Sequence, residues 1–326
     1  MPQINGQDIG ATGYGLMGLT WRPDPVPHDQ AFEAMRAALN SGMNFWNGGE
    51  FYGTPENNSM TLLEAYFAKY PEDADKVVIS IKGAMGEMGP DGSPEGVRRS
   101  IDNVLKQLNG RKKLDVFECA RRDPNVPMAD TFGVMQEYID KGLLGGISLS
   151  EVSAETIHEA VKHAKIVAVE VELSIFSPDV LTNGTAAACA EHGIPLVAYS
   201  PIGRGILGGN LRTQDDIPPM LRDFGFPRFS PENFPNNLEL FNHVNALAQQ
   251  KGCTPAQLAL AWTRSLARRP GMPTIIPIPG STSVSRVREN AVQVELTDAE
   301  MAAIDGILDK FEVKGERYPG YFPTNT

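Results

Sequence analysis

A phenol and an ammonium group in the first third of the chain have the chemistry that proton donation at neutral pH requires. Tyr52 follows an apolar stretch that ends at Asn47, and Lys82 ends the apolar stretch 76–82. A tyrosine hydroxyl has an ordinary pKa near ~10, so it acts in proton transfer only when a neighbouring charge stabilises the phenolate. We therefore predict that Lys82 lies beside Tyr52.

These two residues need a scaffold that brings the ends of successive strands to one rim. Apolar stretches typical of buried parallel strands recur along the chain. They lie at 11–17, 43–47, 76–82, 114–119, 144–148, 166–171, 195–200 and 274–279. Amphipathic helices separate them, with start signals at Ser93-Pro94, at Thr254-Pro255 and at a capping box from Thr297 to Glu300. This alternation predicts a single (β/α)8 TIM barrel domain over 1–326.

One connection is much longer than the others. Residues 201–235 are rich in proline and glycine and contain Phe224, Phe226, Phe229 and Phe234. Long loops at the C-terminal rim of a barrel commonly carry binding residues. The aromatic content favours a lid or cofactor clasp, and a disordered insertion is the alternative.

Composition excludes several classes of function. The chain has 326 residues, with 29 Lys and Arg against 40 Asp and Glu, and a net charge of −11. This acidity argues against a nucleic-acid partner. No stretch approaches the roughly 20 apolar residues of a membrane span, and the start lacks a basic segment, so we expect a soluble cytoplasmic protein without a membrane partner. The composition does not predict an oligomeric state.

Cysteine and histidine spacing gives no sign of a metal site. Cys119, Cys189 and Cys253 are far apart and form no CxxC pair, so we expect buried free thiols. The five histidines show no HExxH spacing and are typical of helix surfaces or caps. We predict that the protein holds no metal.

Two later segments have features of an anion site and an aromatic platform. The stretch 275–290 runs from the last strand into a helix start where Ser281, Ser283 and Arg286 add donors to the free backbone N–H groups. It fits a phosphate, although an ordinary capped helix has the same pattern. Tyr199 ends the seventh strand before a glycine-rich turn, where its ring can stack on a planar cofactor.

Together these segments resemble the aldo-keto reductase family across almost the whole chain. The resemblance implies NADPH dependence and a tetrad of Asp, Tyr, Lys and His around the carbonyl, of which Tyr52 and Lys82 match two members. It also implies that Tyr199 stacks on nicotinamide and that Ser150 contacts the carboxamide. The implied pyrophosphate clasp is Ser200, Ile202, Gly203 and Gly205, and the implied 2′-phosphate and adenine segment is Gly280, Ser281, Ser283, Arg286, Glu289 and Asn290.

The chain departs from the family pattern at four positions. Asn47 stands where the family has Asp, Ala120 stands where it has His, and Glu151 and Glu170 replace the amides that read the carboxamide. An ionised carboxylate accepts from the carboxamide NH2 but cannot donate to its oxygen. Without the acid, Lys82 is left uncompensated, so it either lowers the pKa of Tyr52 further or loses its own proton. The small Ala120 side chain opens space for a bulkier substrate.

Within the family, the segments 15–23, 46–53 and 119–121 resemble the fungal pyridoxal reductases. This implies reduction of the aldehyde of pyridoxal to pyridoxine with NADPH, in which Tyr52 donates a proton and Asn47 and Lys82 complete the catalytic group. The candidate substrate residues are Trp21, Glu50, Phe51, Ala120 and Arg121. Rim packing remains an alternative for Trp21 and Phe51, as does a structural pairing of Arg121 with Glu50 or Glu118. A broader aryl-aldehyde or ketone reductase and a non-catalytic NADPH-binding subunit are the other functions that fit.

Overall fold

The computed structural model describes residues 1–322 and 324. All eight predicted strands occur, although the first is shorter than expected because a helix begins at Met17. They are β3 (Tyr14–Gly15), β4 (Phe45–Gly49), β5 (Val78–Gly83), β8 (Leu114–Cys119), β9 (Leu144–Ser150), β10 (Ile166–Glu172), β11 (Leu196–Tyr199) and β12 (Ile275–Pro277). Each pairs in parallel with its neighbour in chain order.

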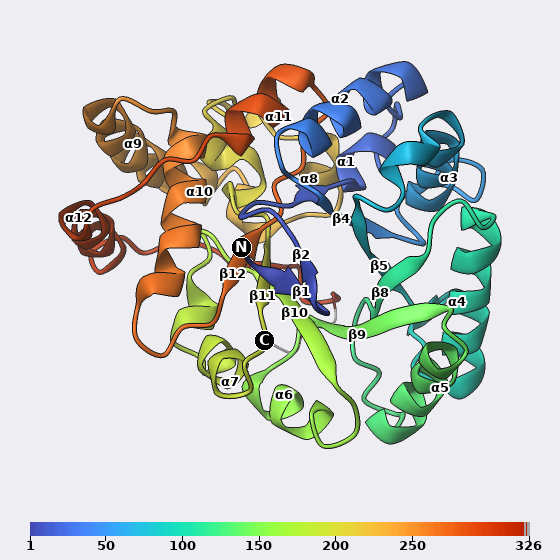
Figure 1. Ribbon diagram of the computed structural model, residues 1–326. Coiled ribbons are helices and arrows are strands. Elements are labelled where there is room, and N and C mark those ends of the chain that lie inside the picture. Colours follow the sequence, from blue (N-terminus) through green and yellow to red (C-terminus); the bar gives the residue numbers. More distant parts are fainter. Residues whose placement is uncertain (323, 325–326) are drawn as a thin grey trace.

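Backbone hydrogen bonds close the sheet. The N–H of Gly13 donates to the carbonyl of Pro277 at 2.9 Å, and the N–H of Gly15 donates to the carbonyl of Pro279 at 3.2 Å. The first and last strands therefore meet, and the predicted (β/α)8 barrel is confirmed (Figure 1).

A ring of helices surrounds the barrel (Figure 1). The helices are α1 (Met17–Thr20), α2 (His28–Asn40), α3 (Ser59–Lys69), α4 (Pro94–Leu108), α5 (Met128–Asp140), α6 (Ala154–Ala160), α7 (Thr185–Glu191), α8 (Pro219–Asp223), α9 (Phe234–Lys251), α10 (Pro255–Ser265), α11 (Val284–Ala291) and α12 (Asp298–Leu308). The predicted start signals are confirmed: Ser93 accepts from the N–H of Gly96, and Thr254 and Thr297 each form a capping box.

An N-terminal hairpin that the sequence analysis did not predict closes one end of the barrel. It consists of β1 (Gln3–Ile4) and β2 (Gln7–Asp8), which lie over the barrel centre in Figure 1. Buried Ile4 and Ile9 pack there against the inward side chains of several strands, among them Phe45, Val78 and Val116. This apolar layer fills the N-terminal half of the barrel.

Because side chains alternate along a strand, the inward positions two residues further on lie in the next layer. These positions are Asn47 after Phe45, Glu118 after Val116 and Glu170 after Ala168. All three are buried, with 4%, 0% and 2% of their surface exposed. The barrel interior therefore changes from apolar to charged toward the C-terminal rim.

The predicted long connection at 201–235 is present, and short helices give it local structure. It contains the short helices η3 (Gly203–Gly208), η4 (Gln214–Asp216), α8 and η5 (Pro227–Phe229). Of its aromatic residues, Phe226, Phe229 and Phe234 are buried and Phe224 is exposed. The three buried rings belong to the main hydrophobic core, where Phe229 meets Phe176 edge-on with ring centres 6.0 Å apart, and these contacts hold the segment beside the rim.

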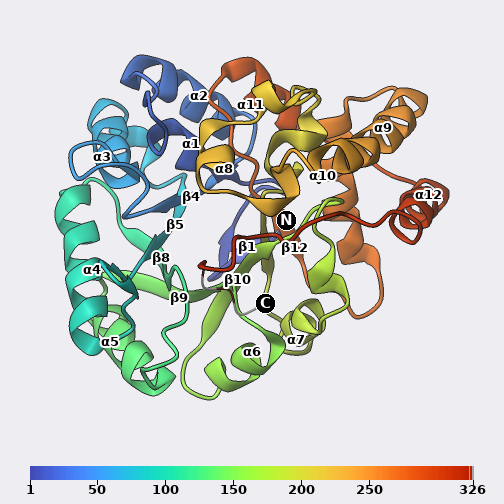
Figure 2. The same ribbon diagram turned by 180° about the vertical axis from the view of Figure 1, so that it is seen from behind.

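The C-terminal tail crosses the barrel mouth (Figure 2). Tyr318 in this tail shares a hydrogen bond of 2.7 Å with the hydroxyl of Tyr199, and Arg317 donates to Glu151 and Glu172 at 3.0 Å each. The tail thus lies beside the end of β11, where the aromatic platform was predicted.

Candidate active site

Lys82 sits among three side chains from three other strands. Its Nζ lies 2.9 Å from Oδ1 of Asn47, 2.5 Å from Oε1 of Glu170 and 3.2 Å from Oε1 of Glu118. The amide of Asn47 also donates to Oε2 of Glu170 at 2.6 Å, and the hydroxyl of Ser148 donates to Oε2 of Glu118 at 2.8 Å. We call Lys82, Asn47, Glu118 and Glu170 the lysine cluster.

The lysine cluster keeps its ammonium charged. Burial alone lowers the pKa of Lys82, but the carboxylates of Glu170 and Glu118 outweigh this effect and raise the pKa above its ordinary value. Burial raises the pKa of Glu170 to about 8, against the opposing effect of Lys82 and with a further increase from Glu118. The expectation of an uncompensated Lys82 is therefore wrong, because two glutamates take the place of the missing aspartate.

Sequence reasoning missed Glu118 as a member of the site. Its carboxylate is fully buried between Lys82 and Ser148. The available signal was the presence of two acids, Asp115 and Glu118, in the buried strand 114–119, since buried carboxylates are almost always paired.

Tyr52 lies against the lysine cluster. Nζ of Lys82 is 5.9 Å from the centre of the tyrosine ring, and Tyr52 is 9% exposed. Burial raises the pKa of Tyr52 to about 12, although the charge of Lys82 lowers it. The prediction that Lys82 lies beside Tyr52 is confirmed, and its charge does lower the pKa of Tyr52, but burial has the larger effect.

Two aromatic side chains frame Tyr52. Trp21 stacks on it with ring centres 5.2 Å apart, and Phe51 meets it edge-on at 5.0 Å. Both are only half-buried. They form an apolar wall next to the phenol, as a planar substrate ring would require.

The other three predicted substrate residues, Ala120, Arg121 and Glu50, contact different parts of the protein. Ala120 is 2% exposed at the end of β8, and its N–H donates to the carbonyl of Gly83. Arg121 places its guanidinium 5.7 Å from the ring of Tyr318 in the tail. The structure does not bring Glu50 to this group, because its carboxylate accepts hydrogen bonds from Ser100 and Asn103 of α4.

The residues predicted to hold nicotinamide lie at the ends of β9 to β11. The hydroxyl of Ser150 is buried and has no hydrogen-bond partner among the described residues. An orphaned hydroxyl of this kind fits a carboxamide that would complete its hydrogen bonds. Tyr199 is fixed through its hydroxyl, which donates to Oε1 of Glu151 at 2.8 Å.

Glu151 and Glu170 differ in their partners. Glu151 is held by Tyr199 and Arg317, and Arg317 and Arg121 lower its pKa against the effect of burial. Glu170 belongs to the lysine cluster. The two acidic departures from the family pattern therefore serve two separate charge networks.

The predicted pyrophosphate clasp forms a tight turn after β11. Ser200, Gly203 and Gly205 all have positive φ angles, of 50°, 56° and 100°. The same turn contains Ile202 and Arg204, and the guanidinium of Arg204 binds Glu172 through bonds of 3.1 and 2.8 Å. Such a turn leaves backbone groups close to the surface, where an extended phosphate ligand can approach.

The predicted 2′-phosphate segment surrounds the start of α11. The hydroxyl of Ser283 caps the helix at the N–H of Arg286. The Arg286 guanidinium donates to Glu289 at 2.8 Å and to Asn210 of the 201–235 segment at 2.9 Å. Of the remaining residues, Gly280 is exposed, Ser281 is half-buried and Asn290 is buried. A cation and a helix N-terminus thus face the same region, which fits a phosphate.

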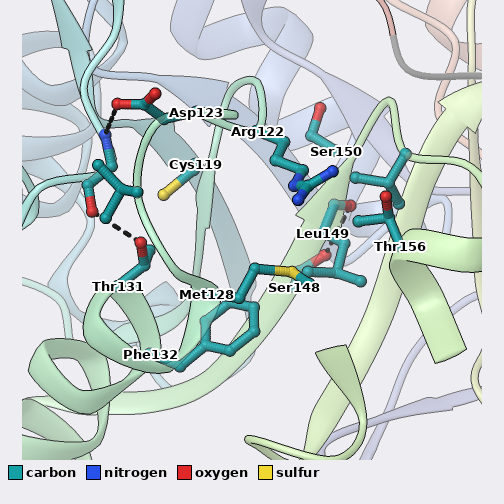
Figure 3. Close-up of a pocket in the computed structure, with 13 residues that line it drawn as sticks. Cys119, Arg122, Asp123, Met128, Thr131, Phe132, Ser148, Leu149, Ser150 and Thr156 are labelled. Atoms are coloured by element: carbon teal, nitrogen blue, oxygen red, sulfur yellow. Dashed lines mark hydrogen bonds between the residues drawn. The ribbon is translucent and has the colours of Figure 1, made fainter. Parts of the chain in front are cut away.

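A small cavity lies outside the barrel, between the ends of β8 and β9 and the helices α5 and α6 (Figure 3). Cys119, Met128, Phe132 and Leu149 line it. Its volume of about 40 Å³ has room for a few water molecules and not for a substrate ring. Cys119 and Cys253 are half-buried and only Cys189 is fully buried, so the expectation of three buried thiols is wrong for two.

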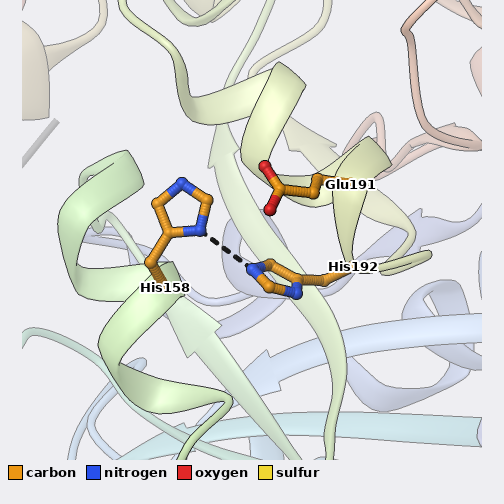
Figure 4. A group of neighbouring side chains, drawn as sticks. All are labelled: His158, Glu191 and His192. Atoms are coloured by element: carbon orange, nitrogen blue, oxygen red, sulfur yellow. Dashed lines mark hydrogen bonds between the residues drawn. The ribbon is translucent and has the colours of Figure 1, made fainter.

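Two histidines and a glutamate meet at the ends of α6 and α7 (Figure 4). Nδ1 of His158 lies 2.9 Å from Nε2 of His192, with Glu191 beside them. The imidazoles satisfy each other, and the described part of the chain offers no hydrogen bond to their other ring nitrogens. A metal ligand normally has such a second partner, so the geometry gives no reason to assign an ion here.

Comparison with known proteins shows the family of this chain. The sequence profile of the Aldo/keto reductase family matches residues 11–309, so the chain belongs to this family. It is similar to two yeast proteins with provisional names as pyridoxal reductases. One, from Schizosaccharomyces pombe, is 42% identical over 98% of this chain and 97% of its own length. The other, from Saccharomyces cerevisiae, is 40% identical over 94% and 95%.

Two further proteins are similar to this chain at lower sequence identity. An uncharacterised oxidoreductase of Schizosaccharomyces pombe is 34% identical over 96% of this chain and 90% of its own. The crystal structure of a thermostable aldo-keto reductase with the inhibitor epalrestat superposes with a TM-score of 0.73, covering 94% of this chain and 98% of that one. At 23% identity, this match supports the fold alone. Among the described residues, no helix has the length and apolarity needed to cross a membrane.

Proposed function

We propose that this protein reduces the aldehyde of pyridoxal to the alcohol of pyridoxine with NADPH as the reductant. The observation that carries the proposal is the buried phenol of Tyr52 beside a lysine that two carboxylates keep charged. The similarity to two yeast proteins named as pyridoxal reductases supports the substrate. Ser150, Tyr199 and Arg286 are the residues that we assign to the cofactor.

Tyr52 is the proton donor in this proposal. Bound NADPH supplies the hydride. The hydroxyl of Tyr52 then donates its proton to the oxygen of the reduced carbonyl, and no other phenol adjoins Lys82 among the described residues. Lys82 does not donate itself, since the carboxylates around it raise its pKa and hold its proton. Its positive charge instead stabilises the phenolate that Tyr52 becomes.

The surroundings of Tyr52 favour a planar aromatic aldehyde. Trp21 and Phe51 present apolar ring surface on one side, and Ala120 has a smaller side chain than the histidine of the family pattern. The ring of pyridoxal carries a hydroxyl and a hydroxymethyl group next to its aldehyde, so a small side chain at this position suits it better than an imidazole.

Arg204 and Arg121 are the candidate contacts for cofactor phosphate and substrate oxygen at the rim. Arg204 is fixed by Glu172 and stacks on Phe226 and Tyr318 at 4.6 Å each. The clasp therefore has a cation that the resemblance did not predict.

The direct test is NADPH oxidation by the purified protein, with and without pyridoxal. We expect oxidation that depends on pyridoxal and exceeds the rate with benzaldehyde or a ketone at equal concentration. A similar kcat/KM for all of these carbonyl compounds would indicate the broader reductase, and no oxidation with any of them would indicate a non-catalytic NADPH-binding subunit.

A further inference from the structure

The lysine cluster contains one cation and two carboxylates. Lys82 contacts both Glu118 and Glu170, and these three side chains are 0–5% exposed. Their other neighbours are the amide of Asn47, the hydroxyl of Ser148 and the phenol of Tyr52, which are neutral. Arg121 acts on Tyr52 from the rim. With every carboxylate ionised, the buried cluster would carry one uncompensated negative charge.

Burying an uncompensated charge is costly, and such a group usually takes up a proton instead. The hydrogen-bond pattern shows where a proton is needed. Oε1 of Glu118 is buried and, apart from its ion pair with Lys82, has no hydrogen-bond donor among the described residues. A carboxyl proton held between the two glutamates would give this oxygen a donor.

We propose that Glu118 and Glu170 share one proton, and that this proton keeps the group behind Tyr52 electrically neutral while the enzyme works. The catalytic part of this inference rests on the proposed function. Glu118 and Glu170 are positioning residues here, because they act on the substrate only through Lys82 and Tyr52.

The shared proton has a consequence for proton donation. Glu170 and Glu118 each raise the pKa of Tyr52 when ionised. Loss of the shared proton therefore makes the phenol a weaker acid at the moment when it must protonate the reduced carbonyl. The raised pKa of Glu170, about 8, places this loss at the alkaline side of neutrality.

The proton can be observed without activity. Ordinary glutamate has a pKa near ~4.3, so surface carboxyl groups are ionised at pH 6.5. We expect the infrared spectrum at pH 6.5, after subtraction of the spectrum at pH 9.5, to show the carbonyl band of a protonated carboxylic acid. Glu170→Gln and Glu118→Gln should each abolish this band, because one carboxylate then balances Lys82. Glu137→Gln, at an exposed carboxylate of α5, should leave it unchanged.

The kinetic arm uses benzaldehyde, which has no ionisable group in this pH range. We expect kcat/KM of the wild type to fall above a midpoint near pH 8, by at most about tenfold per pH unit and toward a lower plateau, because the phenol becomes a weaker acid without being lost. Both glutamine variants should lose this alkaline fall, whatever their absolute rates.

The proposal is overturned if the wild type shows no such band, or if the band survives in both glutamine variants. A band that behaves as expected, together with an alkaline fall that persists in both variants, overturns the catalytic role. If no aldehyde supports NADPH oxidation, the proposed function and the catalytic role both fail, while the infrared arm still decides the shared proton.

Discussion

Asn47→Asp restores the residue of the family tetrad, and the structure predicts that it harms this protein. The amide of Asn47 makes two hydrogen bonds: Oδ1 accepts from Lys82 at 2.9 Å, and Nδ2 donates to Glu170 at 2.6 Å. An aspartate keeps the acceptor but replaces the donor with a carboxylate oxygen. Two carboxylate oxygens would then face each other at the distance of a strong hydrogen bond, with no proton between them.

The expected loss follows from the bond that is removed. A hydrogen bond to a charged group contributes about 1.5–3 kcal/mol, and leaving a buried acceptor unsatisfied costs a similar amount. A proton taken up between the introduced carboxylate and Glu170 would restore the bond, so the variant should have a raised carboxyl pKa. Such a group stabilises the fold at low pH and loses that contribution as the pH rises through its folded pKa.

The measurement is the free energy of unfolding in urea, at pH 6 and pH 9, for the wild type, Asn47→Asp and Asn47→Asp/Glu170→Gln. We expect the single variant to lose about 1.5–3 kcal/mol at pH 9 and less at pH 6. The double variant puts an amide donor opposite the new carboxylate and restores the wild-type charge, so it should recover most of the loss. A single variant as stable as the wild type at pH 9 would refute the role given to Asn47.

Two further predictions concern the cofactor and the substrate. Arg286→Ala should raise the Kd for NADPH and change the Kd for NADH much less, because the guanidinium faces the proposed 2′-phosphate. Arg288→Ala, exposed on the same helix, is the control. Equal weakening of both cofactors by Arg286→Ala would contradict the assignment of Arg286 to the 2′-phosphate. Ala120→His should reduce kcat/KM for pyridoxal more than for benzaldehyde, because the larger imidazole should crowd the more heavily substituted ring. Equal gains on both substrates would indicate a damaged general reductase instead.

The sequence was enough to predict the barrel. Each apolar strand carries its own signal, and helix caps such as Ser93 and Thr254 depend only on neighbouring residues. The segment 201–235 was harder, because its short helices are held by contacts of Phe226 and Phe229 with distant parts of the chain. Local propensity does not contain such contacts.

The site was predicted in part for a similar reason. Tyr52 and Lys82 are recognisable in their own segments, and the rim of the barrel brings them together. Glu118 and Glu170 each share a mainly apolar strand with a second acid, Asp115 or Glu172. Only the pairing of the strands in the barrel places Glu118 and Glu170 around one ammonium. The sequence shows that an aspartate is missing at Asn47, but it does not show which carboxylates replace it.

The most direct test of the account is the product formed by the wild type and by Tyr52→Phe. The substitution keeps the ring between Trp21 and Phe51 and removes only the hydroxyl. We predict that the wild type forms one pyridoxine per NADPH consumed, and that the variant binds NADPH normally but is slower by about 10²–10⁴-fold, the usual contribution of a positioned acid. Pyridoxine formation by the variant at a near-normal rate would contradict the assignment of Tyr52 as the proton donor.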